Sequence, residues 1–313
     1  MSAPLRPLTT GELLDRTFHL YRNNFFLFAG IATVAALSVV GASLLLMVLG
    51  ISLPAPGPNA DPRAFLPQFA TYFGIWGLFY LLGATLATGA TIYAVSKVHL
   101  GQVTSISESY GRVFPRMGRL ILIALAIILR VVLLAVILFL CLFVVILLLG
   151  LIFARMGSSS DRDFIVGYVF GLLAVLTLYV LLIRLYLRYS LAVQACVLEN
   201  TGTNDSMKRS AFLTLGSLWR IFLIYLLMGV IGIALSFALQ SPAELLFRTG
   251  SLLALIWQFL ATFVAYTLSF PISNIAISLV YYDQRVRKEA FDLQLMMESL
   301  GQDSSQAAAA PVG

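Results

Sequence analysis

The sequence contains few charged residues. Asp, Glu, Lys and Arg together make up 11% of the 313 residues, about half of the usual share of about 25% in a soluble domain. The charges fall in islands, and the apolar stretches between them are long enough to cross a hydrocarbon core of ~30 Å, which takes about 20 helical residues. These features predict an integral membrane protein and exclude an ordinary soluble domain.

Cysteine and histidine are also scarce. Cys141 and Cys196 both lie in apolar contexts, which favours neither a disulfide framework nor a thiolate metal site. His19 and His99 have no carboxylate or cysteine cluster at metal-ligand spacing. A P-loop, a dinucleotide fingerprint and a nucleophile elbow are absent from the sequence. We therefore expect no metal, no cofactor and no catalytic residue, and the sequence favours a protein that is not an enzyme.

Alternation of apolar and polar residues is missing from the long apolar runs. Continuous apolar runs are typical of transmembrane helices, whose backbone groups are satisfied within the segment, and not of transmembrane barrels. The first run is too long for a signal-peptide core and is expected to be retained. The sequence thus predicts an all-α protein with six transmembrane helices. The six runs are 25–53, 72–95, 120–153, 164–195, 221–239 and 252–280.

The basic residues are distributed unevenly between the two sides of these runs. Most lie at the amino end, in the second and fourth loops and near the carboxyl end. Those in the other loops are Arg63, Arg155, Arg162 and Arg248. The positive-inside rule then places both termini in the cytoplasm of a bacterial cell, with the chain in the cytoplasmic membrane. The basic surface is expected to face anionic lipid head groups, and nucleic acid is not an expected partner.

Short amphipathic segments precede the apolar runs. Thr9 with Glu12, and Ser105 with Glu108, have the spacing of a capping box and predict helix starts. Apolar residues then recur at helical spacing with charges between them, as in helices that lie in the membrane interface.

These segments indicate an internal repeat. Phe18, Phe114 and Phe212 occupy equivalent places in three such segments, and each segment is followed by two apolar runs. We interpret the chain as three copies of an interfacial helix plus a helical hairpin. Residues 1–300 would form one membrane domain and residues 301–313 a disordered tail. The predicted parts are repeats 9–103, 104–202 and 203–283, and an amphipathic helix at 284–300.

The second apolar run is rich in small residues, among them Gly83 and Gly89. Small residues allow helices to approach closely in lipid. Close packing is the favoured interpretation, and a lining for a substrate path is the alternative.

Arg130, Arg184 and Arg188 are the candidate binding residues, with Asn274 as a further member. The arginines are expected near the cytoplasmic edge of the third and fourth runs, where guanidinium groups suit a phosphate. They could form a site for an anionic head group or a phosphorylated solute. The simpler interpretation is that they extend to the interface as ordinary membrane arginines.

Three stretches resemble a known family. They are residues 11–25, Leu198-Glu-Asn with Arg209-Ser210, and residues 281–293. In these stretches the chain is similar to bacterial multi-span proteins grouped with the glycerophosphoryl diester phosphodiesterase membrane domain. The resemblance concerns the membrane part and carries no reacting group. It therefore implies a membrane protein without the soluble phosphodiesterase domain that gives the family its name.

Three functions remain open from the sequence. The first is a non-enzymatic membrane protein that binds lipid or acts as a scaffold or accessory subunit of a membrane complex. Its protein partner would be another protein or a second copy of the chain. The second is a transporter or lipid translocase for an anionic lipid or phosphorylated solute. The third is an enzyme acting on phospholipid head groups. Because the acids lie outside the six runs, a proton-coupled pump is disfavoured.

Overall fold

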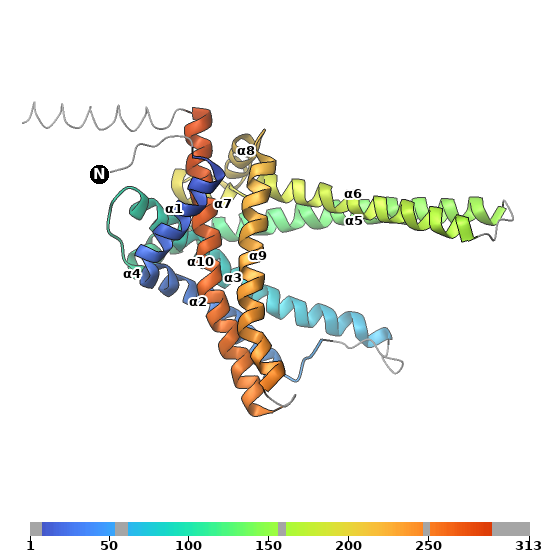
Figure 1. Ribbon diagram of the computed structural model, residues 1–313, viewed down its shortest axis with the longest axis horizontal. Helices are drawn as coiled ribbons and strands as arrows, with labels where there is room; N and C mark the ends of the chain where they lie inside the picture. Colours follow the sequence, from blue (N-terminus) through green and yellow to red (C-terminus); the bar gives the residue numbers. More distant parts are fainter. Residues whose placement is uncertain (1–7, 54–61, 156–160, 247–250, 290–313) are drawn as a thin grey trace, which may run out of the picture.

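The computed structural model describes residues 8–53, 62–155, 161–246 and 251–289. Over these residues the chain is helical without strands, which confirms the predicted all-α fold (Figure 1). In chain order the elements are α1 (Thr10–Asn23), α2 (Phe25–Val48), α3 (Pro62–His99), α4 (Ile106–Val113), the 3₁₀ turn η1 (Phe114–Arg116), α5 (Met117–Arg155), α6 (Asp161–Tyr189), α7 (Ala192–Glu199), α8 (Thr203–Thr214), α9 (Leu218–Leu246) and α10 (Leu252–Glu289).

Six helices are long and apolar enough to cross a membrane, as the sequence predicts: α2, α3, α5, α6, α9 and α10. They pack as the hairpins α2–α3, α5–α6 and α9–α10, and α10 also packs against α2. The α5–α6 hairpin extends in one direction and the α9–α10 hairpin in another, from a shared end (Figure 1). The fold is therefore that of a multi-pass membrane protein whose hairpins diverge.

The short helices occupy the predicted lead-in positions before each hairpin. At α1 the hydroxyl of Thr9 accepts a hydrogen bond from the Glu12 amide at 3.3 Å, and the Glu12 carboxylate accepts one from the Thr9 amide at 2.8 Å. At α4 the Ser105 hydroxyl accepts from the Glu108 amide at 3.1 Å. Both predicted helix starts are confirmed. The third lead-in is α8, and the preceding helix α7 ends where Asn200 adopts a left-handed conformation with φ of 54°.

The predicted break before residue 284 is wrong. Helix α10 runs without interruption from Leu252 to Glu289, through Pro271, so residues 284–289 are its last turns and not a separate helix. The reason is tertiary: Tyr281 and Asp283 are buried there by contacts with other helices, which keeps this part of α10 in the folded body. Residues 290–300 and the predicted tail lie outside the described residues.

Close packing between α2, α3 and α4 confirms the favoured interpretation of the small residues. A Cβ atom added to Gly83 would overlap the Ser38 side chain on α2. One added to Gly89 would lie 2.6 Å from Cγ1 of Val113. Neither position has room for a side chain, so these two glycines let the helices meet.

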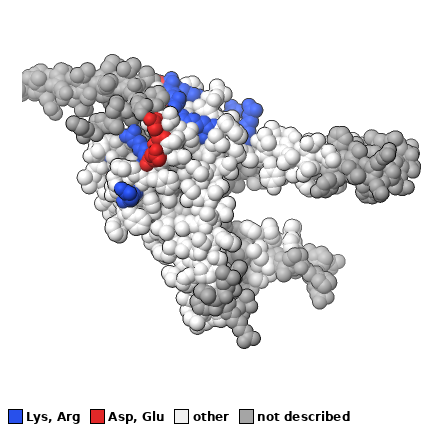
Figure 2. Space-filling view, viewed as in Figure 1, with Lys and Arg blue, Asp and Glu red and all other residues white. Residues whose placement is uncertain are grey.

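We use the term polar end for the part of the molecule formed by α1, α4, α7, α8 and the last turns of α3 and α10. On the face shown in Figure 2, charged side chains gather over this end, whereas the described surface of the hairpins is uncharged. Large apolar side chains cover the hairpins, including Leu133, Phe139 and Leu173, all of which are exposed. An exposed apolar surface of this length fits a surrounding of lipid chains.

Candidate functional site: a polar-lined cavity between the hairpins

A cavity of about 1070 Å³ lies among the diverging helices. Its lining comes from α3, α5, α6, α7, α9 and α10, so all three hairpins contribute. Ligand pockets in proteins usually enclose about 300–1,000 Å³, and this one reaches the upper end of that range. The cavity exists because the α5–α6 and α9–α10 hairpins separate as they leave the polar end (Figure 1).

Neutral polar groups line the cavity. Two of its tyrosines, Tyr186 on α6 and Tyr225 on α9, pack edge to face with ring centroids 5.8 Å apart. Among the described lining residues none is charged. Further hydroxyl and amide side chains in the lining are Tyr80, Thr85, Thr88, Gln194, Ser236, Ser273 and Asn274.

The cavity lining extends along the helices over much of a membrane thickness. On α9 the lining residues run from Tyr225 to Ser241, a separation of about 24 Å at a helical rise of 1.5 Å per residue. Polar groups lie at both ends of this stretch of α9, and Ser269 and Ser273 of α10 add hydroxyls to the lining. Leu81, Ile128 and Ile233 alternate with the polar groups. The cavity can therefore accommodate a molecule with both a polar and an apolar part.

Gln194 has an unusual position in this lining. It lies near the start of α7, is only 3% exposed, and among the described residues no donor reaches its side-chain oxygen. A buried polar atom without a partner costs about 1–3 kcal/mol, so such groups are few in folded proteins. Sequence reasoning missed Gln194, although it lies inside the predicted apolar run 164–195, where a polar residue is the available signal.

Asn274 is the one sequence-predicted site residue that lines the cavity. Its amide nitrogen donates to the Phe270 carbonyl at 2.9 Å, one turn earlier in α10. Tyr266, Ser269 and Ser273 line the same cavity. Their spacing along α10 was the signal available in the sequence, since polar residues three to four positions apart share one helix face.

The three predicted arginines are exposed and do not line the cavity. Arg130 donates to the Ala126 carbonyl at 3.1 Å and to the Met207 sulfur at 3.3 Å, and its guanidinium lies 5.7 Å from the ring centre of Tyr189. Arg184 and Arg188 lie on exposed positions of α6. Arg130 therefore sits where α5, α6 and α8 meet, outside the cavity that Asn274 lines.

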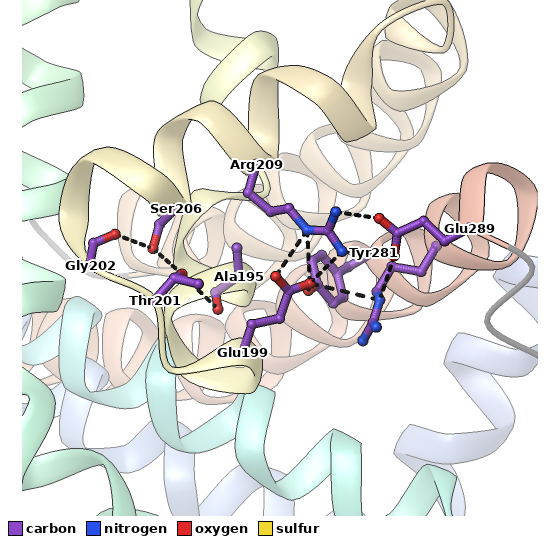
Figure 3. A network of polar contacts seen from close by, with 9 residues as sticks. Ala195, Glu199, Thr201, Gly202, Ser206, Arg209, Tyr281 and Glu289 are labelled. Carbon is purple, nitrogen blue, oxygen red and sulfur yellow. Dashed lines mark hydrogen bonds and ion pairs between the residues drawn. The ribbon is translucent and has the colours of Figure 1, made fainter. Parts of the chain in front are cut away.

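A second polar assembly joins α7, α8 and α10 at the polar end. Arg209 donates to the Glu199 carboxylate at 2.9 Å and to the Glu289 carboxylate at 2.7 Å (Figure 3). The Tyr281 hydroxyl donates to Glu199, and Arg285 pairs with Glu289 at 3.2 Å. We call these five residues the Arg209 network.

The charges around Arg209 indicate that the Arg209 network has a structural role. Burial alone would lower the pKa of Arg209, but hydrogen bonds and charge from Glu289 and Glu199 outweigh it and raise the pKa further above its ordinary value. A guanidinium held in this way stays charged at every physiological pH and does not exchange protons. The network binds three helices together and offers no acid–base chemistry at Arg209.

A second ion cluster fastens the beginning of the chain to α9 and α10. The Asp283 side chain is fully buried and pairs with Arg220 at 2.5 Å and with Arg287 at 2.8 Å. The Leu8 amide donates to Asp283 at 2.7 Å, and its carbonyl accepts from both arginines at 2.7 and 2.6 Å. Every charge in this cluster has a partner, as buried charges require.

The two clusters include six of the twelve charged residues in the resemblance motifs: Glu199, Arg209, Asp283, Arg285, Arg287 and Glu289. Glu199, Arg209, Tyr281, Asp283 and Glu289 all belong to those stretches, and the structure gives each one a partner. Their role in the structure is to hold the polar end together. Within the described residues no group of histidine, cysteine and carboxylate side chains could hold a metal.

The fold and the cavity define a class: a membrane protein with six helices long enough to span the membrane, diverging hairpins, and a cavity between them lined by apolar and neutral polar residues. The profile of a protein family matches residues 11–310, nearly the whole chain, and the chain belongs to this family, described as a domain of unknown function, DUF7847. No curated protein and no solved structure matches the chain.

Proposed function

We propose that this chain is a non-enzymatic lipid-binding membrane protein that holds a membrane lipid in the cavity between its hairpins. The observation that carries the proposal is a cavity of about 1070 Å³ with both apolar and neutral polar lining, formed by helices long enough to cross a membrane. A lipid has the same division into an apolar and a polar part. The described lining contains hydroxyl and amide groups but no carboxylate, histidine or cysteine, and this favours binding over head-group chemistry.

A blocking substitution tests lipid binding directly. Gly229 lines the cavity, and a Cβ atom added there has no neighbouring atom within 4 Å. Gly229→Trp should therefore fill part of the cavity without moving the backbone. Gly74→Trp is the matched control, because Gly74 is exposed on α3, outside the cavity, and also has open space around it.

The measurement is the amount and identity of lipid retained by detergent-purified protein in native mass spectrometry. Wild type and Gly74→Trp should carry a bound lipid, and Gly229→Trp should carry much less. Equal lipid on Gly74→Trp and Gly229→Trp would remove the cavity as the binding place and the proposal with it.

Lipid translocation is a second candidate, favoured by the extent of the cavity lining. The cavity extends along about 24 Å of α9, with polar residues at both ends of this stretch and on the neighbouring α10, and a hydrocarbon core is ~30 Å thick. A head group could follow such a lining from one leaflet to the other. Fluorescent lipids in vesicles containing the protein should then redistribute between leaflets, and vesicles containing Gly229→Trp should not. Equal rates of lipid redistribution with and without the protein would rule out translocation and would not affect the proposal of lipid binding.

We also propose that the protein lies in a bacterial cytoplasmic membrane with both termini in the cytoplasm. The distribution of basic residues supports this orientation, and the polar end would then face anionic head groups. In a chain with both native cysteines replaced, Ser52→Cys should react with a membrane-impermeant thiol reagent added to intact cells. Gln102→Cys, at the polar end, should react only after lysis. The reverse pattern would invert the topology.

A further inference from the structure

We propose that the lipid in the cavity carries an uncharged head group with free hydroxyls, and that the Gln194 amide hydrogen-bonds one of them. This inference rests on the proposed lipid-binding function and specifies the class of lipid. Mono- or diglycosyl diacylglycerols and diacylglycerol itself belong to this class. Phosphatidylglycerol, which has hydroxyls but also a phosphate, does not.

The unpartnered oxygen of Gln194 indicates what kind of group is missing. The side chain is 3% exposed, it lines the cavity, and its oxygen accepts no hydrogen bond from the described residues. A carbonyl oxygen accepts and cannot donate, so its partner must be a donor. A ligand hydroxyl supplies the donor and remains able to accept in turn.

The charge of the lining favours a neutral ligand. No lysine or arginine is among the described lining residues, and Arg130, Arg184 and Arg188 are exposed outside the cavity. A phosphate placed beside Gln194 would lose its hydration without gaining a counter-charge, which is strongly unfavourable. Hydroxyls need only the hydrogen bonds that the lining offers.

Gln194 also marks one end of the cavity as the place for the head group. It lies on α7 at the polar end, together with Ser190, whereas Gln240 lines the other end of the cavity, near the end of α9. Gln194 is buried and Gln240 is exposed, and both line the cavity. The same substitution at each glutamine therefore tests at which end the head group is held.

The experiment measures binding of four probes with identical acyl chains to detergent-purified protein: monoglucosyl diacylglycerol, diacylglycerol, the methyl ether of diacylglycerol, and phosphatidylglycerol. Wild type should bind the first two more tightly than the last two. Gln194→Leu should weaken binding of the two hydroxylated neutral probes about tenfold, equivalent to about 1.4 kcal/mol, and leave the methyl ether unchanged. Gln240→Leu should behave as wild type.

A thermal measurement separates this role from a loss of folding. Because Gln194→Leu removes a buried unpaired amide, the ligand-free variant should be at least as stable as wild type. Addition of monoglucosyl diacylglycerol should then stabilise wild type more than the variant. Tighter binding of phosphatidylglycerol, or equal loss from Gln194→Leu and Gln240→Leu, would overturn this inference while leaving lipid binding intact. Failure of all four probes to bind would instead remove the proposed function.

Discussion

Replacing Arg209 by methionine should destabilise the polar end of the protein. Methionine keeps much of the length of the side chain but removes the hydrogen bonds from Arg209 to Glu199 at 2.9 Å and to Glu289 at 2.7 Å. Each hydrogen bond to a charged group contributes about 1.5–3 kcal/mol. The side chains are only 15–25% exposed, so solvent replaces little of this loss.

Arg209→Met should not leave either carboxylate as a buried charge without a partner. Breaking a buried ion pair costs about 3–5 kcal/mol when the remaining charge has no partner. Here Glu199 keeps the Tyr281 hydroxyl, and Glu289 keeps Arg285 at 3.2 Å. We therefore expect Arg209→Met to lower the free energy of unfolding by about 3 kcal/mol, the lower end of both ranges, and the Tm by about 5 °C.

Cys196 provides the assay. Its side chain is fully buried on α7, next to the network, whereas Cys141 is exposed. In a Cys141→Ser background, a thiol-reactive fluorophore added to detergent-purified protein reports the temperature at which α7 opens. Arg184→Met is the matched control, because Arg184 is exposed. An equal Tm for Arg184→Met and Arg209→Met would refute the reasoning about the network.

Two further substitutions probe the packing and the second ion cluster in the same assay. Gly83→Ala places a methyl group against Ser38 and should lower the free energy of unfolding by about 1–3 kcal/mol. Gly41→Ala is the control, because a Cβ atom there meets open space and should not destabilise the protein. Equal effects of the two substitutions would contradict close α2–α3 packing. Asp283→Asn leaves two guanidinium groups facing a neutral amide and should lower the free energy of unfolding by about 3 kcal/mol; an unchanged Tm would show that the cluster contributes nothing to stability.

The sequence was sufficient for the helices because each depends on local information. Long apolar runs predict six spanning helices, and the Thr9 and Ser105 caps predict where α1 and α4 begin. The break expected before residue 284 failed because the continuation of α10 depends on burial of Tyr281 and Asp283 against other helices. That burial is a tertiary contact and leaves no local signal.

The cavity could not be predicted from the sequence, because it also depends on tertiary contacts. Hydropathy predicts how deep a residue lies in the membrane, but not which side of its helix faces another helix. Arg184 and Arg188 are one turn apart on α6, and both are exposed. Asn274 lies inside an apolar helix and lines the cavity. Which of these positions faces another helix follows from the packing and not from the sequence of either helix.

The sequence also could not predict which charged residues pair in the two ion clusters. Opposite charges in a chain with only 11% charged residues are expected to pair. Arg209, however, binds Glu199, ten residues before it, and Glu289, 80 residues after it. The sequence indicated that these stretches organise the protein, and the fold was needed to show which charges meet.

Helix α7 connects the two assemblies, because it carries both Gln194 in the cavity and Glu199 in the Arg209 network. A helix of eight residues has little stability of its own, so its position depends on what holds its ends. Arg209→Met should therefore weaken binding of monoglucosyl diacylglycerol at temperatures well below its Tm. Asp283→Asn, in the cluster that does not contact α7, should leave this binding intact at the same fraction of folded protein. If both variants lose binding in proportion to unfolding alone, α7 does not position Gln194.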